Sequence, residues 1–582
     1  MSGKNNSSNI IVGIDLGTST SEIAVIKDGS PVVIPNKNGN LITPSVVYIG
    51  KPGKDGKPEI IVGENATEYL FTRPERTFAE VKRNTGSDFV YEVDGVKYTP
   101  EEIQAMLLGY LVACAEDYLG EKVERAVITV PAYFNDIQRR RTEHSGKLAG
   151  LTVERIINEP TAAAMDFGLD HMDEESKILV FDLGGGTLDV TVLELFGGVV
   201  DVKATSGNNA LGGKDFDEAL MRHIYAGKTT NLTSAARLKA EAVKCKTALS
   251  ESLEYNVLLP LFATGENENI TLEKKVTRTV FENITKHLLA KMRAPVLTAL
   301  GEAKIEAEEL DLILFAGGAT RMPCVGALVR ELLKKEPSQS IDPDLSVARG
   351  AAIQAGIISG AFDQGNEIVL TDVCAFTLQV SSAIKGIYGI REICGEMIKR
   401  NTTIPAEASI IAHPIVDYQK RVTVEVYQGE YIDPENNTYL GEITIDNLPA
   451  KKRESNPIKI TLRYDLNGML NVRGELLSTG KAVETDINMT NAVMREQGEL
   501  FSKDWKNCAL SKTYRPLIRK AEKLVEDLDE NSDVKNEFYN DTIAEELEFL
   551  IEALKEAIVL DNSERAEELK GEIAKILEEE DK

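Results

Sequence analysis

The stretch FDLGGGTLDVTV, from Phe181 to Val192, places three consecutive glycines between two apolar segments. Each glycine inside a strand is entropically unfavourable, so the run predicts a tight hairpin turn rather than a continuous strand. Because glycine has no Cβ atom, the backbone N–H groups of Gly184, Gly185 and Gly186 can approach an anion closely. Phosphate is the ligand that we expect at this turn.

Two aspartates, Asp182 and Asp189, flank the turn. Carboxylates beside a phosphate would repel it unless a divalent cation lay between them, and Mg²⁺ is usually held by one or two carboxylates together with substrate phosphates. We therefore expect both aspartates on the magnesium side of the site. A plain glycine hairpin with exposed carboxylates is the alternative that this stretch leaves open.

The same pattern occurs near the N-terminus, in IVGIDLGTSTSEIAVI from Ile11 to Ile26. Aligning Asp15 with Asp182 superposes the flanking apolar segments, and such a repeat predicts two similar half-domains, each with a phosphate-binding hairpin. A third glycine turn, in LILFAGGATRMP, leads into a predicted helix whose N-terminus suits an anion or a nucleotide.

Composition limits the possible partners. A chain of 582 residues predicts two to four domains. The net charge of -27 argues against nucleic acid or an anionic membrane as a main partner. No apolar run approaches membrane-spanning length, and MSGKNNSSN lacks the apolar core of a signal peptide, so we expect a cytoplasmic location. The scattered cysteines and histidines argue against disulfides and zinc.

The predicted secondary structure changes twice along the chain. Apolar strands alternate with helical stretches up to about Gly360, which is typical of an α/β domain. From Cys374 the pattern is all-β, and Asn467-Gly468 predicts a hairpin between two strands of a β-sandwich. From about Asn491 charged helical sequence follows. An apolar stripe at helical spacing predicts packing in a small bundle, through Leu547, Leu550, Leu554 and Ile558.

Several long motifs resemble the 70-kilodalton heat-shock chaperone family in its bacterial, DnaK-like form. They are GIDLGTSTS, VITVPAYFND, RIINEPTAAAMDFGLD, FDLGGGTLDVTV, LGGKDFD, AGGATRMP, IVLTDV and IKRNTTIP. The resemblance runs from about Ile11 to Asn488, with a weaker helical match to the C-terminus. It implies four parts: an α/β two-lobed, actin-like ATPase domain (1–362), a linker (363–373), an all-β sandwich that binds peptides (374–490) and a C-terminal α-helical lid (491–582).

The resemblance implies an ATP-hydrolysing molecular chaperone in which ATP opens the peptide site and hydrolysis closes it. Its expected cofactors are ATP/ADP and Mg²⁺. Its expected partners are unfolded or extended hydrophobic polypeptides, a J-domain co-chaperone and a nucleotide exchange factor. A specialised relative with a narrow client set is one alternative, and a transferase of the sugar-kinase type, which would share the ATPase core but not the linker or the sandwich, is another.

The resemblance also implies roles for single residues. Asp15 and Asp182 would hold magnesium through its water shell, Lys82 would lie next to the γ-phosphate, and Glu159 would lie near the metal and the attacking water. Phosphoryl transfer depends mainly on positioning and charge neutralisation, which Lys82 and Mg²⁺ would supply. The first phosphate hairpin would comprise Gly17, Thr18, Ser19 and Thr20. The second would comprise Gly184, Gly185, Gly186 and Thr187. The nucleoside side would comprise Lys246, Ser250, Gly317, Gly318, Ala319, Arg321 and Asp344.

Two positions on the nucleoside side depart from the family pattern. Val243 stands where the family has an acid, and a lost charged hydrogen bond would weaken nucleotide affinity by about 1.5 to 3 kcal/mol, roughly ten- to a hundredfold. Ala319 replaces a serine in the third glycine turn.

The coupling and peptide-binding segments also depart. The linker contains Val369, Leu370 and Asp372. Thr371 stands where the family has a leucine, so we expect the linker to dock more weakly on the ATPase domain. In the peptide groove, Ala383 and Ala412 replace a methionine and a phenylalanine, which predicts an altered or weaker peptide preference. The groove positions are Val380, Ser382, Ala383, Ala412, Val422 and Val424.

Overall fold

The computed structural model describes residues 10–54, 56–171, 174–227, 232–262, 270–338, 340–362, 369–387, 389–486, 504–530 and 537–580. The N-terminal MSGKNNSSN, residues 363–368 of the predicted linker and residues 487–503, where the predicted lid begins, lie outside the described residues. The chain divides into two compact units. The first runs to Ala375 and also includes Leu466–Gly468, and the second comprises Phe376–Asp465 and Met469–Lys582.

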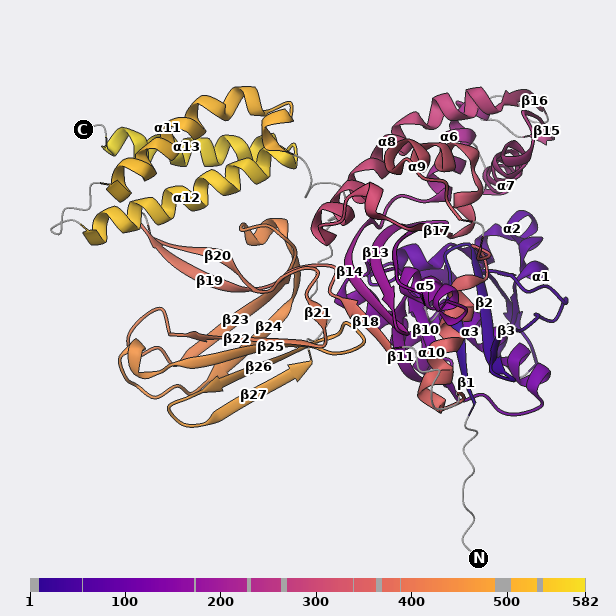
Figure 1. Ribbon diagram of the computed structural model, residues 1–582, viewed down its shortest axis with the longest axis horizontal. Helices are drawn as coiled ribbons and strands as arrows, with labels where there is room; N and C mark the ends of the chain where they lie inside the picture. The colour runs from indigo at the N-terminus through magenta and orange to yellow at the C-terminus, as the bar shows by residue number, and fades with distance from the viewer. Residues whose placement is uncertain are drawn as a thin grey trace, which may run out of the picture. The chain divides into compact units, whose positions relative to one another are not determined.

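The first central sheet of the first unit carries the N-terminal hairpin (Figure 1). Its strands are β1 (Ile11–Leu16), β2 (Thr20–Lys27), β3 (Ser30–Val33), β10 (Arg125–Val130) and β11 (Thr152–Asn158). The order is β11-β10-β1-β2-β3, in which β1 pairs in parallel with β10 and antiparallel with β2. β1 and β10 are buried along nearly their whole length, as expected for strands covered on both faces.

The second central sheet repeats this arrangement. Its strands are β12 (Ser176–Leu183), β13 (Leu188–Phe196), β14 (Val199–Asn208), β17 (Leu312–Ala316) and β18 (Val369–Val373). β12 pairs in parallel with β17 and antiparallel with β13, so each sheet places a parallel neighbour beside a hairpin. The predicted internal repeat is therefore confirmed, with Asp15 and Asp182 near the ends of equivalent strands.

The turns of the two hairpins lie against each other. A Cβ atom at Gly185 would lie 2.1 Å from the Oγ atom and 3.2 Å from the Cβ atom of Ser19, so a side chain at this position would force Ser19 to move. Below the turns, α5 (Glu159–Leu169) packs on β12, α10 (Ser346–Ser359) packs on β1 and β2, and the two helices contact each other. The two halves of the unit therefore meet where the predicted phosphate turns lie.

Further elements flank the first sheet. The basic, polar stretch that follows β10 forms α4 (Asp136–Leu148), and Asn135 and Gln138 form a capping box at its start. The helix α4 packs against α3 (Pro100–Leu119). The smaller elements are β4 (Thr43–Pro44), β5 (Val46–Pro52), β6 (Pro58–Val62), α1 (Glu64–Thr67), α2 (Tyr69–Thr72), β7 (Thr77–Ala79), β8 (Tyr91–Val93) and β9 (Val96–Tyr98).

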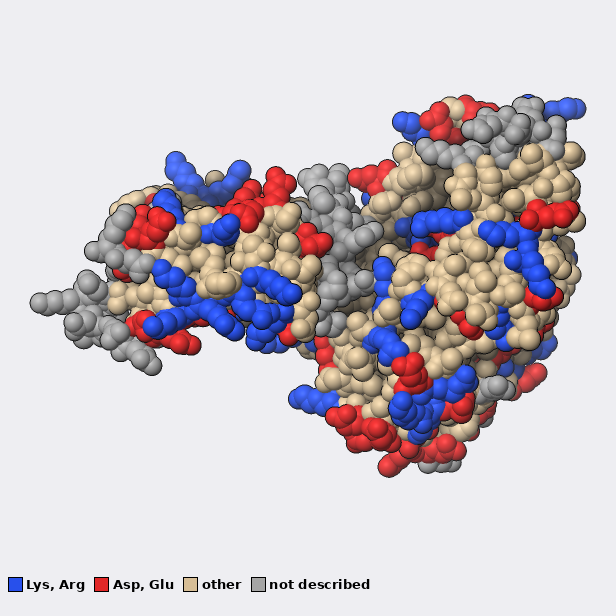
Figure 2. Space-filling view, turned by 90° about the horizontal axis from the view of Figure 1, so that it is seen from above, with Lys and Arg blue, Asp and Glu red and all other residues tan. Residues whose placement is uncertain are grey.

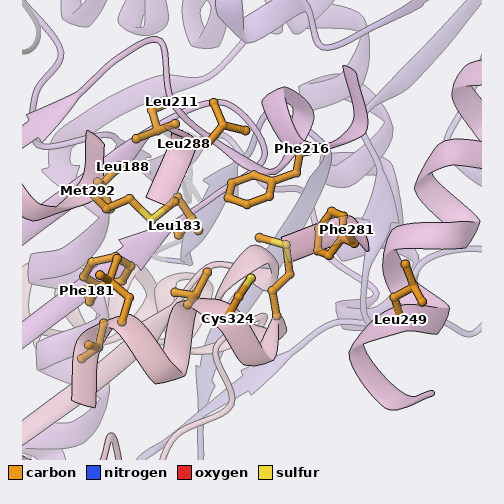
Figure 3. Packing of buried hydrophobic residues seen from close by; sticks show 14 of the residues in the cluster. Phe181, Leu183, Leu188, Leu211, Phe216, Leu249, Phe281, Leu288, Met292 and Cys324 are labelled. Atoms are coloured by element: carbon orange, nitrogen blue, oxygen red, sulfur yellow. The ribbon is translucent and has the colours of Figure 1, made fainter. Parts of the chain in front are cut away.

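A large apolar core fixes the second hairpin to the helices around it. Figure 3 shows Phe181 and Leu183 of β12 packed in one cluster with Phe216, Phe281 and Met292. Phe216 belongs to α6, and the other two belong to α8. The elements here are α6 (Gly213–Ile224), α7 (Leu232–Glu251), β15 (Glu254–Phe262), β16 (Ile270–Thr277), α8 (Arg278–Ala303) and α9 (Pro323–Leu333).

The second unit begins with two four-stranded antiparallel sheets, of order β20-β19-β23-β24 and β22-β25-β26-β27. Their strands are β19 (Leu378–Gly386), β20 (Gly389–Ile398), β22 (Ala406–Ala412), β23 (Arg421–Gln428), β24 (Thr438–Asp446), β25 (Ile458–Tyr464), β26 (Leu470–Leu476) and β27 (Lys481–Asp486). The short strand β21 (Thr403–Ile404) precedes β22. The hairpin predicted at Asn467-Gly468 is confirmed: it joins β25 to β26, and Gly468 has a φ of 66°.

Three helices form a small bundle in the second unit: α11 (Ser511–Glu530), α12 (Glu537–Val559) and α13 (Ser563–Glu580). The predicted apolar stripe is confirmed as packing, because Leu547, Leu550, Leu554 and Ile558 are each at most 1% exposed. Isoleucines of the β19–β20 hairpin pack against the same cluster. Figure 1 accordingly shows α12 beside the tip of this hairpin.

The surface carries charges of both signs. Figure 2 shows Lys and Arg interspersed with Asp and Glu over the face that it presents. Among the described helices, none combines the length and the apolar character needed to span a bilayer.

Candidate functional site

A cavity of about 600 Å³ lies in the first unit where the hairpin turns meet, a volume typical of small-molecule sites. It gathers most of the predicted site residues from both sheets. Gly186, Asp189, Ser250 and Arg321 are not among the residues that line it. Those that do are Asp15, Gly17, Thr18, Ser19, Thr20, Lys82, Glu159, Asp182, Gly184, Gly185, Thr187, Lys246, Gly317, Gly318, Ala319 and Asp344.

The second turn is held by backbone hydrogen bonds. The N–H group of Gly184 donates to the carbonyl oxygen of Thr187 at 3.1 Å. The N–H groups of Gly213 and Lys214, at the start of α6, donate to the carbonyl oxygens of Gly184 and Gly185, at 2.9 Å each. The turn is therefore rigid before any ligand binds, and glycine lets its backbone come close to an anion.

Three buried aspartates lie beside the turns. Asp15 accepts a hydrogen bond from the Oγ1 atom of Thr129 at 2.8 Å, and Asp189 accepts one from the N–H group of Tyr133 at 2.9 Å. The Oδ2 atom of Asp189 has no hydrogen-bond partner among the described residues. Burial, reinforced by the nearby Glu159 carboxylate, raises the pKa of Asp15 and of Asp189 to about 7, and burial also raises the pKa of Asp182.

These carboxylates fit a divalent cation, because a bound cation favours their ionised form and replaces the missing partners. Among the described residues, no three acidic, histidine or cysteine side chains are arranged to hold a metal by themselves. Phosphate and water oxygens would therefore complete the coordination shell, as is usual for Mg²⁺.

Lys82 and Glu159 meet at the cavity although 77 positions separate them. The Nζ atom of Lys82 donates to the Oε1 atom of Glu159 at 2.5 Å, and the two side chains are 5% and 11% exposed. Lys82 lies on a short 3-10 turn after β7, and Glu159 is the first residue of α5. A buried ammonium group is thereby fixed among the carboxylates, where it can neutralise a phosphate.

On the nucleoside side the predicted residues split into two groups. Lys246 lines the cavity, and its Nζ atom donates to the carbonyl oxygen of Gly213 at 2.9 Å and forms an ion pair with Asp217. The hydroxyl group of Ser250 donates instead to the carbonyl oxygen of Lys246, and Arg321 forms ion pairs with Asp342 and Asp344. Val243 lines the cavity with an apolar side chain.

Sequence reasoning assigned no role to three acids that line the cavity, namely Glu22, Glu80 and Asp217, the ion-pair partner of Lys246. Glu22 lines it and is 1% exposed, and burial raises its pKa well above the usual range. As the single acid in the strand TSEIAVIK, it could have been noticed. Glu80 forms ion pairs with Lys214 and Lys239, which lower its pKa although burial opposes the shift. Nothing in the local sequence signals that contact.

The sequence matches the family described as Hsp70 protein over residues 11–582. It is also 43% identical over 482 residues to a protein named "Chaperone protein DnaK" from Thermotoga neapolitana, which covers 81% of this chain and 79% of the relative. The chain belongs to the Hsp70 family. It is an ATP-dependent chaperone of the Hsp70 type, and its enzymatic activity is that of an ATPase.

In this Hsp70 protein the described part of the predicted linker is a strand. β18 pairs in parallel with β14, where Val369 and Leu370 lie beside Val199 and Val200. The hydroxyl group of Thr371 donates a hydrogen bond to Asp201, so the position where the family pattern has a leucine carries a polar contact instead. Asp372 is buried and accepts hydrogen bonds from Asn158 at 2.9 Å and Thr161 at 3.2 Å.

The predicted groove positions of the Hsp70 sandwich differ in exposure. Val380, Val422 and Val424 are buried, Ser382 and Ala383 are exposed, and Ala412 is half-buried. Large apolar side chains that the sequence analysis did not single out lie exposed on and after β22: Ile411 (61%), Val416 (55%) and Tyr418 (60%).

Proposed function

We propose that Mg²⁺ and ATP bind in the cavity between the two lobes of an actin-like ATPase domain, and that ATP opens the peptide site while hydrolysis closes it. The two hairpin turns would bind the phosphates, and Asp15 and Asp182 would hold the magnesium ion. Lys82, Glu159, Asp182 and Thr187 would carry hydrolysis. The nucleoside would lie against Lys246, Ser250, Gly317, Gly318, Ala319, Arg321 and Asp344.

The bound magnesium ion would neutralise charge on the phosphates. Lys82 would add a positive charge where the transferred phosphoryl group becomes more negative, and its ion pair with Glu159 fixes that charge in the cavity. Glu159 would accept a hydrogen bond from the attacking water. Lys82, Glu159, Asp182 and Thr187 are all buried, which strengthens the electrostatic interactions between them.

One observation supports the coupling of ATP binding and hydrolysis to peptide binding. Asp372 of the linker strand accepts hydrogen bonds from Asn158 and Thr161, the residues on either side of the segment that begins with Glu159. A change in the position of Glu159 would therefore alter the contacts of the linker. In the reverse direction, release of Asp372 would leave the polar groups of Asn158 and Thr161 without this acceptor.

The proposed clients are unfolded or extended polypeptides with hydrophobic segments, bound by the sandwich and covered by the helices α11 to α13 as a lid. A J-domain co-chaperone and a nucleotide exchange factor are the proposed partners, and the cytoplasm is the proposed location. Exposed Ile411, Val416 and Tyr418 support an apolar ligand at the sandwich.

The test is the dissociation rate of a labelled unfolded hydrophobic peptide, first with ADP and then with Mg-ATP. We expect faster release with Mg-ATP, and we expect Asp372→Ala to remove the acceleration while Asp88→Ala, at an exposed position outside the linker contacts, retains it. Equal release rates in both nucleotides in the unmodified protein would overturn the proposed coupling.

A second candidate is an ATP-regulated binding module with a narrow client set. The observation that favours it is the small size of two side chains in the predicted groove, exposed Ala383 and half-buried Ala412. A peptide array decides between the two: general preference for hydrophobic segments supports the broad chaperone, and recognition of a few related sequences supports the specialised module.

A further inference from the structure

Glu22 is the single acid of β2, whose other buried residues are Ser21 and three apolar residues. It lies on β2 directly opposite Asp15 of β1, so the two side chains occupy the same face of the first sheet. It lines the cavity and is 1% exposed. A glutamate side chain with this degree of burial needs a partner, because an unpaired buried carboxylate is strongly unfavourable.

The described residues give Glu22 only part of what it needs. The Thr20 hydroxyl group is placed to donate to Glu22, and the Asp15 carboxyl group can share a proton with it. Its Oε1 atom, however, is buried and has no hydrogen-bond partner, and no ion pair to Glu22 occurs within the described residues. This oxygen therefore has capacity to accept a further positive group from the cavity.

The charge around Glu22 is of one sign. Asp15 interacts with Glu22 and Glu159, and Asp182 interacts with Glu159, Asp189 and Asp15. Lys82 is the cation that Asp15, Asp182 and Asp189 share, and it already forms an ion pair with Glu159. Lys214, Lys239, Lys244 and Lys246 also line the cavity, so the acidic excess belongs to this group of five carboxyl groups and not to the whole cavity. A divalent cation bound beside the group would offset its repulsion of nucleotide phosphates.

We propose that Glu22 is a further cation-side residue of this site, which acts with Asp15 and Asp182 to draw in the divalent cation that accompanies the nucleotide. With Glu22 present, nucleotide affinity should depend more steeply on the divalent cation than it would with Asp15 and Asp182 alone. Phosphate and water oxygens remain part of the coordination shell, which agrees with the absence of a protein-only metal cage among the described residues. The inference rests on the proposed binding of Mg²⁺ and nucleotide in this cavity.

The test measures the Kd of fluorescently labelled ADP in Mg²⁺ and in EDTA. The quantity compared between proteins is the ratio of the Kd in EDTA to the Kd in Mg²⁺. Glu22→Gln preserves the shape of the side chain but cannot ionise when a cation binds, so we expect weaker binding in Mg²⁺, little change in EDTA, and a ratio about tenfold smaller. Glu22→Asp can still ionise but holds its carboxyl group farther from Asp15, so its ratio should fall by a smaller factor.

Glu241→Gln is the matched control. It removes the charge of a buried carboxylate that accepts a hydrogen bond from the Tyr255 hydroxyl group at 3.0 Å and does not line the cavity, so its ratio should equal that of the unmodified protein. An unchanged ratio in Glu22→Gln would overturn the inference. Should that variant fail to fold, an unchanged ratio in Glu22→Asp would do so. Failure of the unmodified protein to bind ADP in either solution would instead overturn the proposed nucleotide site.

Discussion

The cavity at the hairpin turns and the contact between the sandwich and the helical bundle both contain buried carboxylates, but the hydrogen bonding of these carboxylates differs. Glu22, which lines the cavity, and Asp189, which lies behind the second turn, each keep a buried oxygen with no hydrogen-bond partner among the described residues. At the bundle, Glu546 is 1% exposed and accepts hydrogen bonds from the N–H group of Ile387 and the Nε atom of Arg391, at 2.6 Å each. Glu556 accepts one from the N–H group of Ile432 at 2.6 Å.

The difference separates two uses of a buried acid. Where protein groups satisfy every oxygen, the acid fastens one element to another, as Glu546 and Glu556 fasten α12 to loops of the sandwich. Where an oxygen lacks a partner at a cavity, as in Glu22, a bound ligand or ion can supply the partner. Burial alone therefore does not identify a functional acid. Its hydrogen bonds and its position relative to a cavity are needed as well.

The largest expected effect is at Lys82. Lys82→Ala should lower the rate of ATP hydrolysis by about 10²- to 10³-fold, because it removes a preorganised charge from the phosphoryl site. ATP binding should be largely retained, since the turns and the cation remain. Single-turnover hydrolysis together with ATP affinity measures both. Lys147→Ala, at an exposed position of α4, is the control, and near-normal turnover in Lys82→Ala would remove Lys82 from its proposed role.

The next effect is at Glu546. Glu546→Ala leaves the Ile387 N–H group and the Arg391 guanidinium group without this acceptor, which should lower the free energy of unfolding of the second unit by about 2 to 4 kcal/mol. Denaturant unfolding and proteolysis of the bundle would measure it. Glu548→Ala, an exposed neighbour on α12, should have little effect. Equal unfolding curves for Glu546→Ala and the unmodified protein would mean that this acid does not fasten α12.

A pH-dependent effect is expected at Glu556. Burial raises the pKa of Glu556 to about 7, although hydrogen bonds from the Ile432 and Asp433 N–H groups and from Asn436 oppose the shift. An acid whose pKa is raised by folding contributes stability that is complete below its unfolded pKa and is lost as the pH rises through about 7. The stability of the second unit should therefore fall between pH 5 and pH 8, and Glu556→Gln should flatten this part of the profile. Identical slopes in both proteins would contradict the assignment.

The smallest effect is at Thr371. Thr371→Val keeps the shape of the side chain but removes the hydrogen bond to Asp201, so β18 should become less stable by about 1 kcal/mol. Hydrogen exchange of the β18 amides would report the change. Thr423→Val, on an exposed position of β23, is the control, and unchanged exchange in Thr371→Val would show that the hydroxyl group does not hold the linker strand.

Sequence predicted the elements whose signals are local. The glycine turn after Asp182, the repeat at Asp15 and the hairpin at Asn467-Gly468 depend on residues that only a turn tolerates. The stripe through Leu547 on α12 depends on helical periodicity. The assignment of Lys82 came from the family resemblance, since a single lysine after a short strand carries no local signal.

The order of residues by itself determined which segments turn, which alternate as strands and which carry an apolar helical face, because these properties depend on neighbours in the chain. Only the tertiary structure decided which distant groups meet. Lys82 reaches Glu159, Asp372 reaches Asn158, and Glu22 shares a face with Asp15. Electrostatic interactions depend on distance and burial in space, so the partners of a charged side chain are fixed only when the chain has folded.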